Sequence, residues 1–237
     1  TIVLERFTMR NGSFIIAPAL PLAADVATKP LVENISVTAK HVVMEGLVDA
    51  LVLDATAAVK AAGAGAGAII AARNVSFTVS DSTFTSLRGS AVSIAASDSA
   101  VVECSIWVAG VTTISASGRL AASVEAASVN NTNLTADTGD GLVSITAGAN
   151  TPVLHDGVGA LGIVQQRTND DPNQGTTLLL SNVRIVVGES VEEVAHHQIS
   201  SVGDLGDYQS TDTVDGTHEI TISALGRLCV AVVGACT

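Results

Sequence analysis

The stretch Val79-Ser80-Asp81-Ser82-Thr83-Phe84 shows a pattern that recurs along the chain: an apolar residue, a polar or small run, and a second apolar residue five positions after the first. The same pattern begins at Val37, Val101, Val124 and Leu178, and weaker copies begin at Val59 and Val153. The starts at 37, 59, 79, 101 and 124 lie 20 to 23 residues apart. A near-constant step of this length is typical of one turn of a solenoid.

A second short run, rich in β-branched residues, follows the first in each repeat, as in Ala91-Val92-Ser93-Ile94 and Val111-Thr112-Thr113-Ile114. Such runs are typical of strands, and the Gly, Ser and Asp residues between them are typical of turns. Stacked turns would place like residues above one another at the strand spacing of about 4.8 Å. The sequence therefore predicts an all-β protein: a right-handed, single-stranded parallel β-helix of about seven turns, in which Val79 stacks on Val101.

The composition suits a narrow interior filled by aliphatic side chains. Of the 237 residues, 47% are hydrophobic but only 3% are aromatic, so Val, Ile, Leu and Ala must supply the core volume. Charged residues make up 14%, against about 25% in an average domain, which argues against intrinsic disorder. In-register stacking explains the low charge, because like charges would otherwise lie side by side in neighbouring turns.

The two ends depart from the repeat and divide the chain into three parts. Residues 1–32 are expected to form an N-terminal turn, a cap and a Pro-containing connector. Residues 33–187 are expected to form the solenoid, with loop insertions at 130–141 and 165–176. Residues 188–237 are expected to hold a short helix, an acidic loop and C-terminal strands.

The short helix is predicted near 188–199, because Glu189 and Glu192 would lie near its start, where carboxylates interact favourably with the helix dipole. Residues 56–72 also suggest a helix. The alternating Gly and Ala at 63–67 argue against it, since each Gly costs a helix about 1 kcal/mol, and we interpret this segment as a thin turn of the solenoid.

The net charge of −12 limits the partners. Eleven basic against 23 acidic residues argue against a nucleic-acid binder, which needs basic groups to displace phosphate counterions. The sequence has no run of about 20 apolar residues, the length that a helix needs to cross a bilayer. The chain begins at Thr1, as expected of a processed product or a piece of a longer protein. We expect no cofactor, and we expect the partner to be a host or matrix protein, a glycan, or further copies of the chain.

Five Asn-x-Ser/Thr sequons favour an extracellular or cell-surface glycoprotein. The candidate glycosylation sites are Asn11, Asn34, Asn74, Asn130 and Asn133. Three cysteines are too few for a disulfide scaffold. Cys104 is expected to be a buried small hydrophobe, whereas Cys229 and Cys236 are candidates for a disulfide across a hairpin or to a segment absent from this chain.

The segments from Asn74 to Phe84 and from Val101 to Ile106 resemble those of the trypanosomatid surface proteins called the dispersed gene family. Those proteins also combine Val/Ala/Gly-rich and Ser/Thr-rich strands in long repeats, and the likeness covers mainly residues 33–147. The resemblance implies a fragment of a very large, glycosylated, membrane-anchored surface protein that serves adhesion. Pectin lyase-like proteins share the expected architecture, although none of their motifs is present here.

Polysaccharide cleavage is an enzymatic use of a β-helix, and hydrolysis of a glycosidic bond needs paired carboxylates. Asp81 and Glu103 each lie two residues after the start of a repeat and would stack in neighbouring turns. A solvated surface pair without chemistry is the favoured interpretation of these two. An alternative polysaccharide site joins residues before and within the second insertion: His155, Asp156, Asp170 and Asp171.

Two further patterns are weak. Glu193 and His197 are four residues apart and would share one face of the predicted helix, but a zinc site needs a third ligand, so no metal site is predicted. An ice-binding array needs Thr at one position in successive turns, and Thr112, Thr132 and Thr146 are out of register in the predicted repeat.

These observations favour a non-enzymatic extracellular or cell-surface module for adhesion or structural display, as a fragment of a larger glycoprotein. One alternative is a polysaccharide lyase or hydrolase of the pectin lyase-like type. Another is a subunit that assembles end to end into a filament through exposed strand edges.

Overall fold

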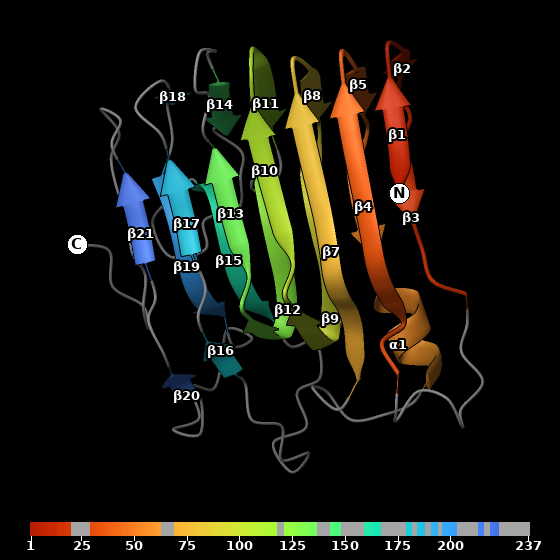
Figure 1. The fold of residues 1–237 in the computed structure, drawn as a ribbon, viewed down its shortest axis with the longest axis vertical. Helices are drawn as coiled ribbons and strands as arrows, with labels where there is room; N and C mark the ends of the chain where they lie inside the picture. Colours follow the sequence, from red (N-terminus) through yellow and green to blue (C-terminus); the bar gives the residue numbers. More distant parts are fainter. Residues whose placement is uncertain are drawn as a thin grey trace.

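Parallel strands, stacked turn upon turn, make up most of the described molecule (Figure 1). The structure is a computed structural model, and its side chains are described as far as residue 136. The fold is all-β and solenoid-like, because successive passages of the chain add strands to the same stacks. The described residues are 1–19, 29–62, 69–117, 121–136, 143–147, 159–166, 179–181, 184–187, 191–193, 196–202, 213–215 and 219–222.

Three main stacks run through the molecule, and each is held by parallel pairing of neighbouring strands. The first stack contains β1 (Ile2–Glu5), β4 (Val32–Lys40), β7 (Ile70–Ser80), β10 (Ser105–Ala109), β13 (Asn133–Ala136), β17 (Arg184–Val187) and β21 (Glu219–Ile222). The second stack contains β2 (Thr8–Arg10), β5 (Val43–Gly46), β8 (Thr83–Ser86), β11 (Thr112–Ala116), β14 (Val143–Ala147) and β18 (Val191–Glu193).

The third stack contains β3 (Phe14–Ile16), β6 (Leu51–Asp54), the first part of β9 (Val92–Val102), the first part of β12 (Ala122–Asn130), β15 (Gly159–Gln166) and β19 (His196–Val202). A short fourth stack joins the beginnings of β4 and β7, the ends of β9 and β12, β16 (Leu179–Ser181) and β20 (Thr213–Asp215).

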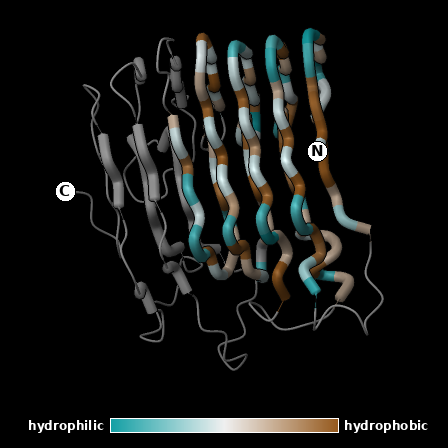
Figure 2. The backbone as a smooth tube through the Cα atoms, viewed as in Figure 1, coloured by the Kyte–Doolittle hydropathy of each residue, from teal (hydrophilic) through white to brown (hydrophobic). Residues whose placement is uncertain are grey.

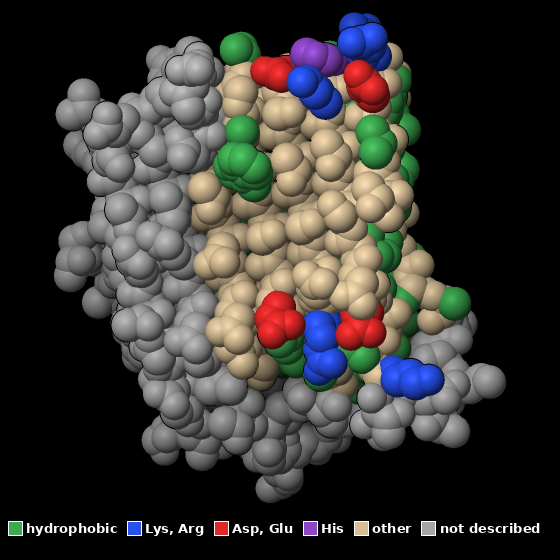
Figure 3. Space-filling model, in the orientation of Figure 1, with side chains coloured by type: hydrophobic (Ala, Val, Ile, Leu, Met, Phe, Trp, Pro, Cys, Tyr) green, Lys and Arg blue, Asp and Glu red, His purple; other side chains and the backbone are tan. Residues whose placement is uncertain are grey.

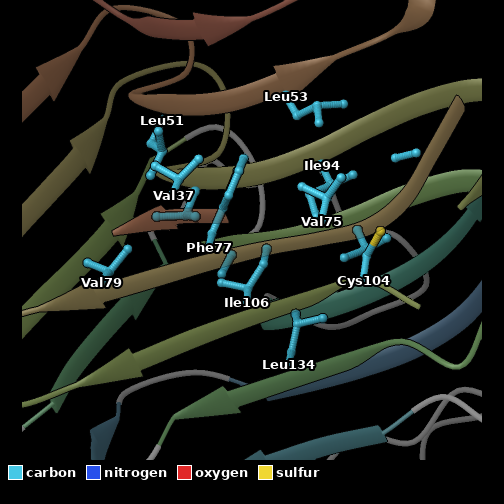
Figure 4. Close-up of a cluster of buried hydrophobic side chains, with 14 of the residues drawn as sticks. Val37, Leu51, Leu53, Val75, Phe77, Val79, Ile94, Cys104, Ile106 and Leu134 are labelled. Carbon is cyan, nitrogen blue, oxygen red and sulfur yellow. The ribbon is translucent and has the colours of Figure 1, made fainter. Parts of the chain in front are cut away.

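Alternation along each strand sends every second side chain into the interior. In the first stack Val37, Phe77, Ile106 and Leu134 occupy one register position and are almost fully buried (Figure 4). Burial of each such side chain stabilises the fold by about 1.5–3 kcal/mol. Aliphatic side chains fill the interior as predicted.

Two corners bound the first stack, and both use backbone in the left-handed region. The asparagine corner lies just before the residues of each strand that pair in the first stack. It comprises Asn34, Asn74, Glu103 and Asn131, with φ between 48° and 57°. The mixed corner, after each strand, comprises Arg6, His41, Asp81 and Gly110, with φ between 49° and 67°. Asn, Asp and Gly tolerate this conformation best, so the sequence places turn residues where the chain must bend. Figure 2 shows hydrophilic residues gathered at both ends of these strands.

The predicted repeat step is wrong. Val79 pairs with Ala39 and Val108, whereas Val101 pairs with Ala72 and Val129, so the two valines lie in different stacks. The true register in the first stack runs through Val37, Phe77, Ile106 and Leu134, at steps of 40, 29 and 28 residues. The five-residue pattern fits any unit of strand, corner and strand, and each turn contains several such units. Successive copies of the pattern are therefore closer together in the sequence than successive turns.

The interpretation of residues 56–72 as a thin turn of strand is also wrong in its first part. Residues Thr56–Ala62 form helix α1, which buries Ala58 and Val59. The carboxylate of Asp54 accepts a hydrogen bond from the Thr56 N–H at 2.9 Å and so caps the helix start. The glycines that argued against a helix follow α1 rather than interrupt it.

The helix predicted near 188–199 is absent, because 191–193 is strand β18 and 196–202 is strand β19. Val191 pairs with Val143 in the second stack, and Ile199 pairs with Ile163 in the third. Pairing with stacked neighbours outweighs the weak local preference that Glu189, Glu192 and Glu193 suggested.

The predicted insertion at 130–141 begins too early, because Asn130 ends β12 and Asn133–Ala136 is β13. Any insertion there starts after residue 136. Most of the second insertion, residues 167–176, lies outside the described residues, while 165 and 166 belong to β15. The domain boundaries at 32 and 187 remain predictions, although β1 pairs with β4 across the first of them.

Candidate binding face

The outward side of the first stack carries two parallel rows of side chains, all of them short and polar except one tryptophan. One row, at the first outward position, is Ser36, Ser76, Ser105 and Asn133. The other row is Thr38, Thr78, Trp107 and Thr135. Together these eight residues of β4, β7, β10 and β13 are called the hydroxyl face below.

Strand pairing fixes the spacing of this face. Neighbouring strands lie about 4.8 Å apart, so the hydroxyl groups repeat at that interval across the stack. The serine and threonine side chains are half-buried between their neighbours, whereas Asn133 is exposed and the Trp107 side chain is 48% exposed. The face is therefore flat and uncharged, with one large aromatic ring standing on it.

Charged side chains gather beyond both ends of the hydroxyl face, while the field between them is free of charge (Figure 3). At the asparagine corner, Arg73 Nη1 lies 3.9 Å from Glu33 Oε1. At the mixed corner, Lys40 Nζ lies 4.0 Å from Asp81 Oδ2. These exposed pairs contribute little to stability, at most about 1 kcal/mol each, and their main effect is to mark where the uncharged field ends.

The mixed corner is held by a carboxylate. Asp81 Oδ1 accepts a hydrogen bond from the Val111 N–H at 3.1 Å, and Gly110 beside it leaves no room for a Cβ atom next to that oxygen. This contact gives Asp81 a structural role. The prediction that Asp81 and Glu103 stack in neighbouring turns is wrong. Asp81 lies level with His41 and Gly110, whereas Glu103 lies level with Asn74 and Asn131.

The sequon asparagines occupy three different environments. Asn34 and Asn74 are exposed at the asparagine corner, where Asn74 Nδ2 donates to Asn34 Oδ1 at 2.6 Å. Asn130 is half-buried, and its Oδ1 atom is buried without a hydrogen-bond partner. Asn11 and Asn133 are exposed, and Asn133 lies on the hydroxyl face.

Of the remaining predicted site residues, the structure describes only Glu193 and His197. The alternative polysaccharide site and the disulfide candidates, His155, Asp156, Asp170, Asp171, Cys229 and Cys236, lie outside the described residues. Glu193 ends β18 and His197 lies in β19. The prediction that the two residues share one face of a helix is therefore wrong. Among the described residues, no group of three His, Cys, Asp or Glu side chains is placed to hold a metal ion.

Cys104 is a free, buried cysteine in the link between β9 and β10, as expected of a small hydrophobe. Burial raises the pKa of its thiol to about 11, and the neighbouring Glu103 carboxylate adds to the rise. Backbone hydrogen bonds at Val75 and Val102 oppose the rise. In the folded chain the protonated Sγ also donates to the Val102 carbonyl at 3.3 Å. A thiol held protonated in this way is a poor nucleophile at neutral pH.

Sequence reasoning missed the hydroxyl face and with it Thr38, Thr78 and Trp107. The signal was present, because Ser36-Val37-Thr38 and Ser76-Phe77-Thr78 share one outward-inward-outward pattern 40 residues apart. The ice-binding test covered Thr112, Thr132 and Thr146, and a step of about 22 residues does not bring Thr38 and Thr78 together. The observed register places Thr38 and Thr78 side by side, and Trp107 then interrupts the row.

Comparison with protein-family models, with curated proteins and with solved structures gives no match to this chain. Within the described part, no helix has the length and apolar character needed to cross a membrane, and α1 has seven residues.

Proposed function

We propose that this chain is a non-enzymatic module of an extracellular or cell-surface glycoprotein, used for adhesion or structural display and built as a right-handed parallel β-helix. The observation that carries the proposal is the hydroxyl face, a flat uncharged surface laid across four strands of a stiff stack. Such a face suits contact over an area, whereas chemistry on a substrate needs convergent groups in a cleft.

Three further points support a non-enzymatic, extracellular module. Four of the five sequon asparagines, Asn11, Asn34, Asn74 and Asn133, are exposed. The carboxylates Asp81 and Glu103 lie at separate corners and do not form the pair that glycoside hydrolysis needs. The resemblance to dispersed gene family surface proteins points the same way and implies that the chain belongs to a larger anchored protein.

Secretion, adhesion and catalysis are measured on the same preparation. The chain is secreted from eukaryotic cells, its glycans are located by mass spectrometry, and beads coated with it are tested for adhesion to cells and matrix. We expect glycosylation and adhesion, without release of reducing ends or unsaturated products from polysaccharides. Product release that is lost in Asp170→Asn or Asp171→Asn would establish the rival lyase or hydrolase function instead.

Filament assembly is a second candidate, favoured by the N-terminal end of the stacks. In the described part, β1, β2 and β3 each pair with a strand on one side only. Val3 and Ile15 are 64% and 59% exposed there. Unpaired edges with apolar side chains promote strand addition from another copy. Sedimentation over a range of concentrations tests this function, and a protein that remains monomeric throughout would exclude it.

A further inference from the structure

Trp107 stands in an unusual place for the only tryptophan of the chain. Phe77 and Phe84 are fully buried, but the Trp107 side chain points outward from β10 and is 48% exposed. Its partners in register on the two neighbouring strands are Thr78 and Thr135. A large aromatic ring on an otherwise polar sheet face marks a contact site, because exposing an indole to water costs more free energy than exposing any of its neighbours on this face.

Asn133 lies within reach of that ring. Ser105 pairs with Asn133 and Trp107 pairs with Thr135, so Asn133 and Trp107 are diagonal neighbours on adjacent strands. Leu134 between them is buried, which sends Asn133 and Thr135 to the same outward face as Trp107. Diagonal neighbours on one sheet face lie about 7–8 Å apart, a gap that long side chains bridge. Asn133-Leu134-Thr135 is also a sequon.

We propose that Asn133 carries an N-linked glycan whose first sugar packs over the indole of Trp107. The C–H groups on the flat side of a neutral pyranose ring match an aromatic face, and the hydroxyl groups of Thr78 and Thr135 flank the ring as hydrogen-bond partners. The uncharged field also fits a neutral ligand: among the side chains that the structure describes, the cations nearest to this face, Lys40 and Arg73, lie beyond its two ends. This inference rests on the proposed extracellular function.

The other sequons lack this arrangement. Among the described residues, Trp107 is the only exposed Phe, Tyr or Trp side chain, and Asn133 is the only sequon asparagine that lies diagonal to it. The side-chain amides of Asn34 and Asn74 are hydrogen-bonded to each other. Asn11 is exposed directly after β2, in the second stack, and so provides a matched control glycan away from the indole.

The test uses the full chain secreted from eukaryotic cells, as wild type, Asn133→Gln, Asn11→Gln, Trp107→Thr and the double variant Asn133→Gln/Trp107→Thr. Mass spectrometry gives the occupancy of each sequon. Because the chain has one tryptophan, its emission wavelength and its quenching by acrylamide report on Trp107 directly. Thr at 107 continues the threonine row, so this variant should fold.

We expect Asn133 to be occupied, and Asn133→Gln to shift the emission to longer wavelength and increase quenching, with Asn11→Gln unchanged. Loss of the Asn133 glycan should lower Tm by about 2 to 4 °C in the wild type and by less in the Trp107→Thr background. Unchanged emission and quenching in Asn133→Gln, or an empty Asn133 beside an occupied Asn11, would overturn this inference and leave the proposed function standing. A chain that is not secreted, or carries no glycan at any sequon, would overturn both.

A further experiment distinguishes packing of the chain's own Asn133 glycan on Trp107 from binding of a free oligosaccharide there. The enzymatically deglycosylated protein is titrated with oligomers of N-acetylglucosamine while Trp107 emission is followed. Saturable binding that occurs equally in glycosylated wild type would show that the ring is open to external sugars, which contradicts its occupation by the Asn133 glycan. Binding to the deglycosylated protein alone supports the proposal.

Discussion

The turn from β4 to β7 and the turn from β7 to β10 build the same stacks with different lengths of chain. From Val37 to Phe77 the chain uses 40 residues, and from Phe77 to Ile106 it uses 29. The longer turn places α1 between the third and fourth stacks, whereas the shorter one passes through a bend in β9, where Asp98 has φ 61°. The link from the first to the second stack stays at two residues in the four turns that begin with β1, β4, β7 and β10, as in His41–Val42 and Asp81–Ser82.

The comparison teaches that, in these turns, the corner between the third and fourth stacks is of free length, whereas the mixed corner between the first and second stacks is of fixed length. Parallel pairing and the buried rows set the register of the first and second stacks, and extra chain is accommodated where it does not disturb them. Insertions in solenoid proteins concentrate on one side for the same reason. Four predictions test this division, in order of decreasing effect.

The largest effect is expected in the row shared by both turns. Phe77→Ala should lower the free energy of unfolding by about 3–5 kcal/mol, because Phe77 packs between Val37 and Ile106 and its removal leaves a cavity. Val59→Ala, in α1 at the corner of free length, should cost only about 1–2 kcal/mol. Urea denaturation measures both, and equal losses would show that α1 is as essential to the stacks as the shared row.

The sequence predicted the shared row's chemistry but not its register. Alternating apolar residues around Val37 and Val79 indicate strands, and the scarcity of aromatics indicates a core filled mainly by aliphatic side chains. Both are observed. The register depends on the length spent at the free corner, and no local pattern reports that length. The Asp54 cap in front of Thr56 was the available signal for α1. Trp107 was missed because its outward position follows only from correct pairing.

The second effect concerns the position after the asparagine corner, which holds Val75 in β7 and Cys104 in the next turn. The pKa of the buried thiol is raised from 9.0 to about 11. Between those pH values the unfolded chain loses the proton and the folded chain keeps it, so stability falls as pH rises through this window and is unaffected below it. Relative to Cys104→Val, the wild type should lose roughly 2–3 kcal/mol between pH 9 and pH 11.

Urea titrations of both proteins at pH 8, 9, 10 and 11 measure this difference, and the variant removes the contributions of other groups that titrate there. A wild-type curve that stays parallel to that of Cys104→Val across the whole range would show that the thiol is not held protonated by the fold.

A smaller effect is expected at the mixed corner of fixed length. Gly110 has φ +67°, and a Cβ atom there would overlap Asp81 Oδ1, which accepts the Val111 N–H. Gly110→Ala should therefore cost about 1–3 kcal/mol from left-handed strain and the disturbed hydrogen bond. Gly12→Ala is the control, because its Cβ meets only the flexible Met9 side chain. Thermal unfolding that ranks Gly12→Ala as the more damaging change would contradict a fixed mixed corner.

The smallest effect is a gain of stability at the asparagine corner. Between β4 and β7 this corner is bridged by the Asn34–Asn74 hydrogen bond, whereas the next turn places Glu103 level with Asn74 and Asn131. Glu103→Asn would continue the row of amides through four turns, and Asn adopts the left-handed backbone of this corner more readily than Glu. We expect a gain of about 0.5–1.5 kcal/mol, seen as a rise in Tm of about 1 to 6 °C.

Glu103→Gln serves as the matched control, because it removes the same charge without supplying a side chain suited to left-handed backbone. Both variants should lower the pKa of Cys104, whose rise Glu103 reinforces, so a shared change in thiol titration with a Tm gain in Glu103→Asn alone separates charge from geometry. The proteins are made in bacteria, since Glu103→Asn would create a new sequon with Cys104 and Ser105. Equal Tm values for the two variants would mean that an Asn at position 103 does not extend the Asn34–Asn74 hydrogen bond to the next turn.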